Sequence, residues 1–249
     1  MRALFLGEGD LDGPARYLAA VLTWSGIAFD HRPDQASLPR AWERRPYDVI
    51  ILSDYRYSSW STRAKKWLIN AVEDQGTGLL MIGGWASFTG LVGAYAKTDL
   101  EKLLPVRCQQ GDDRIQNSTG ALLVPRMKER EGADSPPLVC GYHRATPKPG
   151  SHVMYAFRDL SYRKGRLLLG KPRPAVVVGH AGRGRATAFL TDCAPHWAGG
   201  LVDWGHRRVT VHVKRGVDVE VGERYLKFMR QLIVGVYSNL SRKDGLSSK

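Results

Sequence analysis

The chain is poor in cysteine and has no long hydrophobic run. Its 249 residues include three cysteines, Cys108, Cys140 and Cys193, which are far apart and lack the short spacings of a metal or redox motif. This sparse, odd set favours a reducing compartment, so we expect a cytoplasmic protein without a disulfide framework. No apolar stretch approaches the roughly 20 residues of a membrane-spanning helix. The N-terminal apolar segment turns acidic at Glu8, too early for a secretion signal.

Motifs for metals and nucleotides are also missing. The seven histidines show no ligand spacing such as HExxH. Residues 7–10 (Gly-Glu-Gly-Asp) begin like a dinucleotide fingerprint, but Asp12 stands where the third glycine belongs. We therefore expect no metal site and no cofactor.

Negative charge is scarce in the second part of the chain. Residues 1–100 hold 11 basic and 11 acidic side chains, so residues 101–249 carry the whole net charge of +13. A basic half can attract nucleic acid or another polyanion through counterion release. It can equally be a solvated surface, which we favour because no nucleic-acid motif accompanies the charge.

Apolar runs alternate with helical patterns in the first part of the chain. Short apolar runs at residues 3–6, 48–54 and 78–83 read as strands, and a weaker strand is expected at 27–31. Helical patterns follow Pro14 and the capping residues Ser61 and Thr62. This alternation predicts an α/β fold with a doubly wound, mostly parallel sheet.

The pattern changes after residue 105. Residues 106–150 are rich in glycine, proline and charge, which predicts an irregular insertion that contains β-strands over about 106–170. An antiparallel hairpin is expected over 175–192, short strands over 206–221 and a C-terminal helix over 222–239. We therefore expect one domain over residues 1–241 and a flexible tail over 242–249.

A glycine-rich turn follows the apolar run at 79–82. Gly83 and Gly84 lead into Trp85, and Ser87 and Gly90 follow. In an open α/β sheet, ligands bind and nucleophiles lie at the carboxyl end of such a strand. Tryptophan can neither attack a carbonyl nor hold a metal. Ser87 lies outside a Gly-x-Ser-x-Gly pattern, so we favour a role in capping a helix that starts near Leu91 over a nucleophilic one.

A second candidate group follows the apolar strand that ends at Asp192. His196 can bind a ligand, act as a base or hold its loop by hydrogen bonds. Its neighbour Trp197 can line a pocket together with Trp85, or both rings can fill the core. Asp54 and Glu8 follow two other strands and are expected to border the same crevice.

Arg114 has two interpretations. It can reach the crevice as an anion binder, or it can pair locally with Asp112 or Asp113, which we favour.

Several short motifs occur together in order. They are residues 83–90, the Asp-Asp-Arg triplet at 112–114, Gly-Tyr-His at 141–143, the Gly-Arg-Gly-Arg turn at 182–185 and Ala-Pro-His-Trp at 194–197. In this combination, over roughly residues 2–238, the chain resembles the glutamine amidotransferase-like proteins. These are relatives of the class I glutamine amidotransferases and of the ThuA-like trehalose-utilisation proteins. The resemblance implies a flavodoxin-like sheet whose fourth strand leads into the nucleophile position.

The resemblance also implies a degenerate active site. Gly83 and Trp85 take the places of the first glycine and the cysteine of Gly-x-Cys-x-Gly, and Ser87 replaces the second glycine. His196 matches the catalytic histidine, whereas Ala198 stands where a glutamate is expected. Since two of three triad members are missing, the family's glutaminase activity is not expected here.

These observations lead to three functional hypotheses. The leading one is a non-catalytic amidotransferase-like protein that binds a small ligand or a protein partner at the former active-site crevice. Its expected contacts are Gly84, Trp85, Ser87, Asp54, Arg114, His196 and Trp197. The second is a hydrolase that uses His196 with Ser87 or a water, and the third is a polyanion-binding module in the basic half. Exposed aromatic residues would also suit a homo-oligomer.

Overall fold

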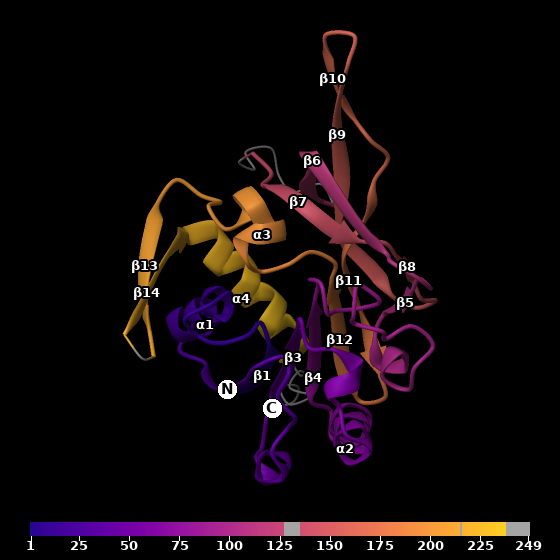
Figure 1. Ribbon diagram of the computed structural model, residues 1–249, viewed down its shortest axis with the longest axis vertical. Coiled ribbons are helices and arrows are strands. Elements are labelled where there is room, and N and C mark those ends of the chain that lie inside the picture. The colour runs from indigo at the N-terminus through magenta and orange to yellow at the C-terminus, as the bar shows by residue number, and fades with distance from the viewer. Residues whose placement is uncertain (127–134, 215, 238–249) are drawn as a thin grey trace, which may run out of the picture.

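The structure is a computed structural model that describes residues 1–126, 135–214 and 216–237. Its centre is a ten-stranded mixed sheet with helices on both faces (Figure 1). One half of the sheet is parallel and runs in the order β2-β1-β3-β4-β12. These strands are β1 (Arg2–Gly7), β2 (Ala28–Arg32), β3 (Val49–Ser53), β4 (Gly78–Ile82) and β12 (Gly184–Phe189). The predicted α/β class is confirmed.

Three main helices cover the parallel half. α1 (Ala15–Trp24) and α4 (Glu223–Tyr237) pack together on one face, and α2 (Thr62–Glu73) lies on the other (Figure 1). The Ser61 hydroxyl accepts a hydrogen bond from the Ala64 N–H at 3.2 Å, which confirms the predicted cap of α2. Shorter helical segments are η1 (Arg40–Arg44), η2 (Tyr57–Ser59), η3 (Leu100–Leu103), α3 (Pro195–Ala198) and η4 (Gly199–Leu201).

The other half of the sheet is antiparallel. It continues from β12 through β11 (Arg173–Ala181), β9 (His152–Arg163), β6 (Arg114–Pro125) and β7 (Leu138–His143), while β10 (Arg166–Leu169) pairs with β9 alone. The predicted hairpin is confirmed as β11–β12. The β content of residues 106–170 is also confirmed, but its strands are longer and more regular than the composition indicated.

Two small two-stranded sheets complete the described structure. β5 (Val106–Cys108) pairs with β8 (Ala145–Pro147), and β13 (Arg208–Val213) pairs with β14 (Val217–Gly222) beside α1. The last pair confirms the short strands expected over 206–221. The end of the predicted C-terminal helix and the predicted tail at 242–249 lie outside the described residues. Within the described ranges, no helix is both long enough and apolar enough to cross a bilayer.

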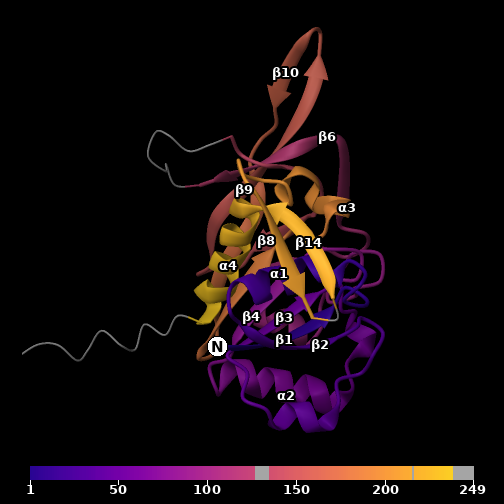
Figure 2. The same ribbon diagram turned by 90° about the vertical axis from the view of Figure 1, so that its left-hand side faces the viewer.

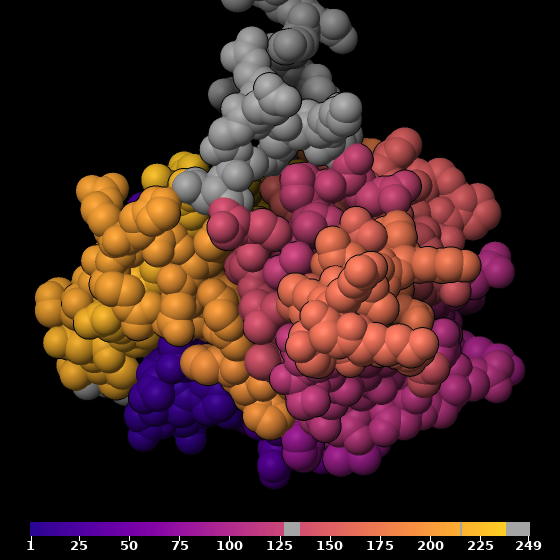
Figure 3. Space-filling model, turned by 90° about the horizontal axis from the view of Figure 1, so that it is seen from above, coloured from indigo at the N-terminus to yellow at the C-terminus, as the bar shows by residue number. Residues whose placement is uncertain are grey.

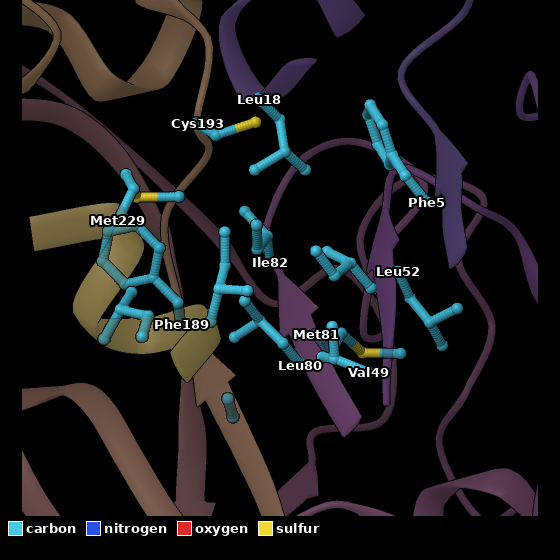
Figure 4. Close-up of a cluster of buried hydrophobic side chains, with 14 of the residues drawn as sticks. Phe5, Leu18, Val49, Leu52, Leu80, Met81, Ile82, Phe189, Cys193 and Met229 are labelled. Carbon is cyan, nitrogen blue, oxygen red and sulfur yellow. The ribbon is translucent and has the colours of Figure 1, made fainter. Parts of the chain in front are cut away.

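The main core lies between the parallel strands and the α1–α4 layer. Figure 4 shows its side chains, among them Leu18 of α1, Ile82 of β4, Phe189 of β12 and Met229 of α4. Each is buried, and full burial of one such side chain contributes about 1.5–3 kcal/mol. This packing holds the carboxyl ends of the parallel strands at one edge of the sheet.

A hairpin projects from the antiparallel half. The outer end of β9 and all of β10 extend beyond the body as a two-stranded ribbon (Figures 1 and 2). Figure 3, viewed from above, shows the salmon-coloured hairpin standing over the surface beneath it. We call residues 160–169 the arm.

Candidate functional site

The candidate site lies at the sheet edge where four parallel strands end, which is where the sequence predicts the crevice. Glu8 follows β1, Asp54 follows β3 and the glycine turn (residues 83–90) follows β4, while Asp192 comes shortly after β12. Because the carboxyl ends of parallel strands meet at one edge, these loops converge there. The sequence predicted this convergence for the glycine turn, Asp54, Glu8 and His196.

The glycine turn has a backbone that a side chain would disrupt. Gly84 has φ +145°, and a Cβ there would lie 2.1 Å from an Asp54 carboxylate oxygen. The Gly83 N–H donates to the carbonyls of Phe189 and Thr191 at 2.8 and 2.9 Å. The turn is therefore fastened to the neighbouring strand end, with Trp85 at its tip.

The helix predicted near Leu91 is wrong. Residues 84–99 form turns, and the first helical segment after them is η3. Phe88, Ala94 and Lys97 have φ values of 49°, 57° and 61°, which are incompatible with a continuous right-handed helix. The glycines at 90 and 93 permit this tight path, because a Cβ at either position would meet backbone oxygens closer than 3 Å.

Trp85 is held between a histidine and an arginine at the rim of the crevice. Its indole Nε1 donates to His196 Nε2 at 3.1 Å, with the ring centroids 5.5 Å apart. The Arg114 guanidinium lies 5.3 Å from the centre of the indole. Trp85 is still 42% exposed, so it forms a surface rather than a plug.

Arg114 pairs locally and also lies beside Trp85. Its Nε and Nη2 donate to the two carboxylate oxygens of Asp112, each at 2.8 Å, which confirms the local pairing. The hydrogen bonds from Arg114 hold the pKa of Asp112 at about 2. The pair therefore presents Arg114 to Trp85 in a fixed orientation.

Ser87 is buried and bonds to the backbone. Its hydroxyl accepts the Asp54 N–H at 3.0 Å, and the Asp54 carboxylate accepts the Ala86 N–H at 2.8 Å. Ser87 therefore caps the loop after β3 instead of a helix. Within the described part of the chain, no hydrogen bond joins Ser87 to His196. Burial raises the pKa of Asp54, which the backbone N–H donors partly offset.

A buried histidine–aspartate pair that no sequence pattern predicted lies below the glycine turn. His143 Nδ1 lies 2.9 Å from Asp113 Oδ1, and both side chains are fully buried. His143 Nε2 lies 2.9 Å from the Gly84 carbonyl and 3.1 Å from the Gly84 N–H. Asp113 also accepts the Gly90 N–H at 2.7 Å, so the pair fastens both ends of the turn. Asp113 and His143 both belong to the short motifs at 112–114 and 141–143, and this was the one sign in the sequence that they act at the site.

Trp197 packs against His143 beneath the glycine turn. It is 1% exposed, and its ring lies 5.1 Å from that of His143. A Cβ at Gly141 would come within 2.7 Å of this indole, so the glycine makes room for it. The Trp197 N–H has no acceptor among the described residues. Trp85 is exposed and Trp197 is buried, so the two rings neither line one pocket together nor both fill the core.

A buried polar cluster lies beneath the rim. Ser53 Oγ donates to Glu8 Oε1 at 2.6 Å, and Cys193 Sγ lies 3.7 Å from the same oxygen. Glu8 and Asp192 also hydrogen-bond each other. Burial and the nearby Asp54 charge raise the pKa of Asp192 to about 7, and burial together with the charges of Asp192 and Asp54 raises the pKa of Glu8 well above its ordinary value. The pair therefore retains a proton near neutral pH.

This cluster is the group of three potential metal ligands found among the described residues. One ligand atom each from Glu8, Asp192 and Cys193 lies within 4.8 Å of the others. Burial raises the pKa of the Cys193 thiol well above its usual range, which disfavours the thiolate that binds metals or attacks amides. Figure 4 shows Cys193 among core side chains, consistent with the packing role expected for it.

The open sheet, the glycine turn after β4 and the histidine that contacts the Trp85 side chain agree with the arrangement that the resemblance to glutamine amidotransferase-like proteins implied. The family model described as "Putative glutamine amidotransferase" matches residues 12–213. The chain therefore belongs to this family. No curated protein matches it in sequence.

Two solved structures from Salmonella typhimurium are similar over most of their length. The cytoplasmic protein STM1381 of strain LT2 is 27% identical with a TM-score of 0.66, covering 80% of this chain and 91% of that protein. The cytoplasmic protein STM3548 is 25% identical with a TM-score of 0.65, covering 79% and 90%. A β-galactosidase from Rahnella sp. R3 shares the fold at 14% identity and a TM-score of 0.51, over 78% of this chain and 29% of that enzyme.

Proposed function

We infer that this protein is a family member without the thiol-dependent glutaminase route, and that it binds a small polar ligand at the rim of its crevice. The hydrogen bond from Trp85 Nε1 to His196 Nε2 carries this proposal. In thiol-dependent amide hydrolysis, a histidine nitrogen takes the proton of a cysteine. Here that nitrogen accepts an indole N–H, which cannot serve as a nucleophile.

The rim suits a ring-shaped polar ligand such as a sugar or a nucleoside. Trp85 offers an exposed aromatic surface, and aromatic side chains supply much of the contact area in small-molecule sites. When Nε2 of neutral His196 accepts the indole proton, Nδ1 carries the ring proton. Nδ1 has no partner within the described chain, so it is available to donate to a ligand oxygen.

The other expected site residues position this surface. Gly84, Ser87 and Asp54 shape the glycine turn, and Trp197 supports it through His143. Arg114 is the remaining candidate contact, since its guanidinium lies beside the exposed indole. The proposed ligand contacts are therefore Trp85, Arg114 and His196.

Calorimetry with three probes tests the proposal. Glucose, adenosine and L-glutamine represent sugars, nucleosides and the family's substrate class. We expect at least one to bind the wild type, and Trp85→Ala to weaken that binding by at least tenfold. Trp24→Ala is the matched control, because Trp24 is 40% exposed but lies at the end of α1.

Two results would count against ligand binding at the rim. One is the absence of heat from all three probes at millimolar concentration. The other is equal weakening by Trp85→Ala and Trp24→Ala, which would place the bound probe elsewhere.

A hydrolytic function is the second candidate. Ser87 is a poor nucleophile here, because its hydroxyl is buried and accepts a hydrogen bond from the Asp54 N–H. His196 is exposed and leaves a route through an activated water. Ester hydrolysis that His196→Ala abolishes and Ser87→Ala preserves would support this route.

The arm gives the polyanion hypothesis a specific location. Arg163, Lys164 and Arg166 form no ion pair with any described residue, and the arm contains no acidic side chain. Binding of a labelled single-stranded RNA that weakens steeply with salt, and is lost when the three become serine, would support it. Binding that survives these substitutions would place the contact elsewhere.

A cytoplasmic location completes the proposal. The two Salmonella relatives are described as cytoplasmic proteins, and the described cysteines are free thiols. Fractionation of cells that produce the tagged protein would test this. Recovery with membranes or outside the cell would contradict it.

A further inference from the structure

A cavity of about 540 Å³ lies between the sheet and α4. Its walls come from β9, β11, β12 and one side of α4, which packs beside β12 (Figure 1). Pockets for small molecules usually enclose about 300–1,000 Å³. None of the proposed ligand contacts at the rim lines this cavity, so it is a separate candidate site. We call it the α4 pocket.

One stripe of α4 faces this pocket and ends in a glycine. Phe228, Gln231, Leu232 and Gly235 are three or four residues apart, so they share one side of the helix. Glycine is less favourable than alanine in a helix by about 1 kcal/mol. A Cβ at Gly235 would meet nothing within 4 Å, so packing does not require the glycine. Its effect is to leave open space at this end of the stripe.

The pocket is apolar at one end. Tyr155 of β9 pairs with Val176 of β11, and residues paired across antiparallel strands point to the same face. The Tyr155 ring packs edge-on against Phe228, with the ring centroids 5.3 Å apart. Phe228 and Leu232 are buried, and all four of these side chains line the pocket. The apolar part of a ligand would be removed from water here.

Polar side chains gather at the other end. Two residues further along β11, Val178 pairs with His152 on one side and with Thr187 on the other. His180 pairs with Arg185 in the next row, about 7 Å further along the strands. This end therefore offers a hydroxyl, two imidazoles and a guanidinium. None of the described residues that line the pocket is acidic.

The Thr187 hydroxyl is a buried group without a hydrogen-bond partner among the described residues. Thr187 is only 4% exposed. A buried polar group that lacks a partner costs roughly 1–3 kcal/mol, which a ligand oxygen can offset by accepting its proton. Arg185 Nη1 donates to the Gly235 carbonyl at 3.1 Å, which holds the positive charge at this end of the pocket.

We propose that the α4 pocket binds an organic anion with an apolar body, of the class of medium-chain carboxylates. The chain of such a ligand lies against Tyr155, Val176 and Phe228, and its carboxylate accepts a hydrogen bond from the Thr187 hydroxyl. The charge of Arg185 favours this anion over an uncharged alcohol of the same length. A cationic ligand would meet Arg185 without an acidic side chain to offset the repulsion.

Isothermal calorimetry of the full chain with octanoate and octanol tests the proposal. We expect octanoate to bind, and octanol, which has the same chain without a charge, to bind at least tenfold more weakly. Thr187→Val should weaken octanoate binding at least tenfold, as expected for one hydrogen bond to a charged group. Thr210→Val is the matched control, because Thr210 is exposed on β13, and it should change binding less than twofold.

A second variant and a stability measurement keep the result interpretable. Gly235→Leu places a side chain in the open space of the pocket and should abolish octanoate binding. Urea unfolding of Thr187→Val should show no loss of stability, because the hydroxyl that it removes has no partner to lose. If Thr187→Val does not fold, Gly235→Leu takes its place in the binding test.

Four results would overturn the proposal. One is the absence of heat from octanoate at about 5 mM. Another is octanol binding as tight as that of octanoate, which would show no preference for an anion. Equal losses from Thr187→Val and Thr210→Val would place the ligand outside the pocket. Loss of octanoate binding in Trp85→Ala would place it at the rim.

Discussion

Replacing Asp192 with asparagine should stabilise the protein at pH 8 far more than at pH 5. Asp192 is 4% exposed and lies beside Glu8 and Asp54. Burial and the Asp54 charge raise its pKa from 3.8 to about 7. Asparagine keeps the side-chain oxygen that accepts the Ala194 N–H at 2.9 Å but never ionises.

The sign follows from proton linkage. The folded state holds the Asp192 proton up to about pH 7, whereas the unfolded chain releases it near pH 3.8. Wild-type stability therefore falls as pH rises between those values, and it levels off above the folded pKa. From pH 5 to 7 the loss is about two pKa units, or at most about 3 kcal/mol. The variant lacks this loss.

Urea unfolding followed by tryptophan fluorescence measures the effect. The stability gain of Asp192→Asn over wild type should grow by about 2–3 kcal/mol between pH 5 and pH 8. Asp12→Asn is the matched control, because Asp12 is exposed and should show no such growth. A gain that is the same at both pH values, or a variant less stable than wild type at pH 8, would refute the buried-proton interpretation.

Three further substitutions test how the glycine turn is held, each by urea unfolding. Gly84→Ala should lower the free energy of unfolding by roughly 3 kcal/mol or more, because the new Cβ would overlap the Asp54 carboxylate and alanine is strained at the φ of this position. A loss below about 1 kcal/mol would contradict this geometry. Ser87→Ala should cost about 1–2 kcal/mol by leaving the Asp54 N–H unpaired, and a stability equal to that of the wild type would show that this hydrogen bond does not hold the turn. Asp113→Ala should cost roughly 3 kcal/mol because His143 loses its buried acceptor, and an unchanged stability would show that the pair does not fasten the turn.

The parallel half of the fold was predictable because its signals are local. Fully buried strands such as Val49–Ser53 are apolar at nearly every position, and Pro14 and Ser61 mark the helix starts. The antiparallel half was harder to predict. Its long strands β6 and β9 carry polar and charged residues on exposed faces, so their composition is typical of loops.

The candidate site was predictable only in part. Trp85, Asp54 and His196 each follow a strand of the parallel half, so the topology predicts that they lie at the same edge of the sheet. The Asp113–His143 pair joins residues 30 positions apart and has no local pattern. The buried state of Glu8 and Asp192 was also hidden, because a carboxylate after a strand ordinarily faces water. No helix begins near Leu91, because residues such as Phe88 and Ala94 adopt left-handed backbone conformations. Their residue types do not predict these conformations.

Glutamate release from L-glutamine is the most direct test of the central claim that this crevice no longer performs thiol-dependent amide hydrolysis. The structure leads us to expect no release above the buffer background from the wild type. His196→Ala should behave identically, since in this proposal the histidine accepts the indole N–H of Trp85 and activates no thiol. Turnover by the wild type that is lost in His196→Ala would contradict the account.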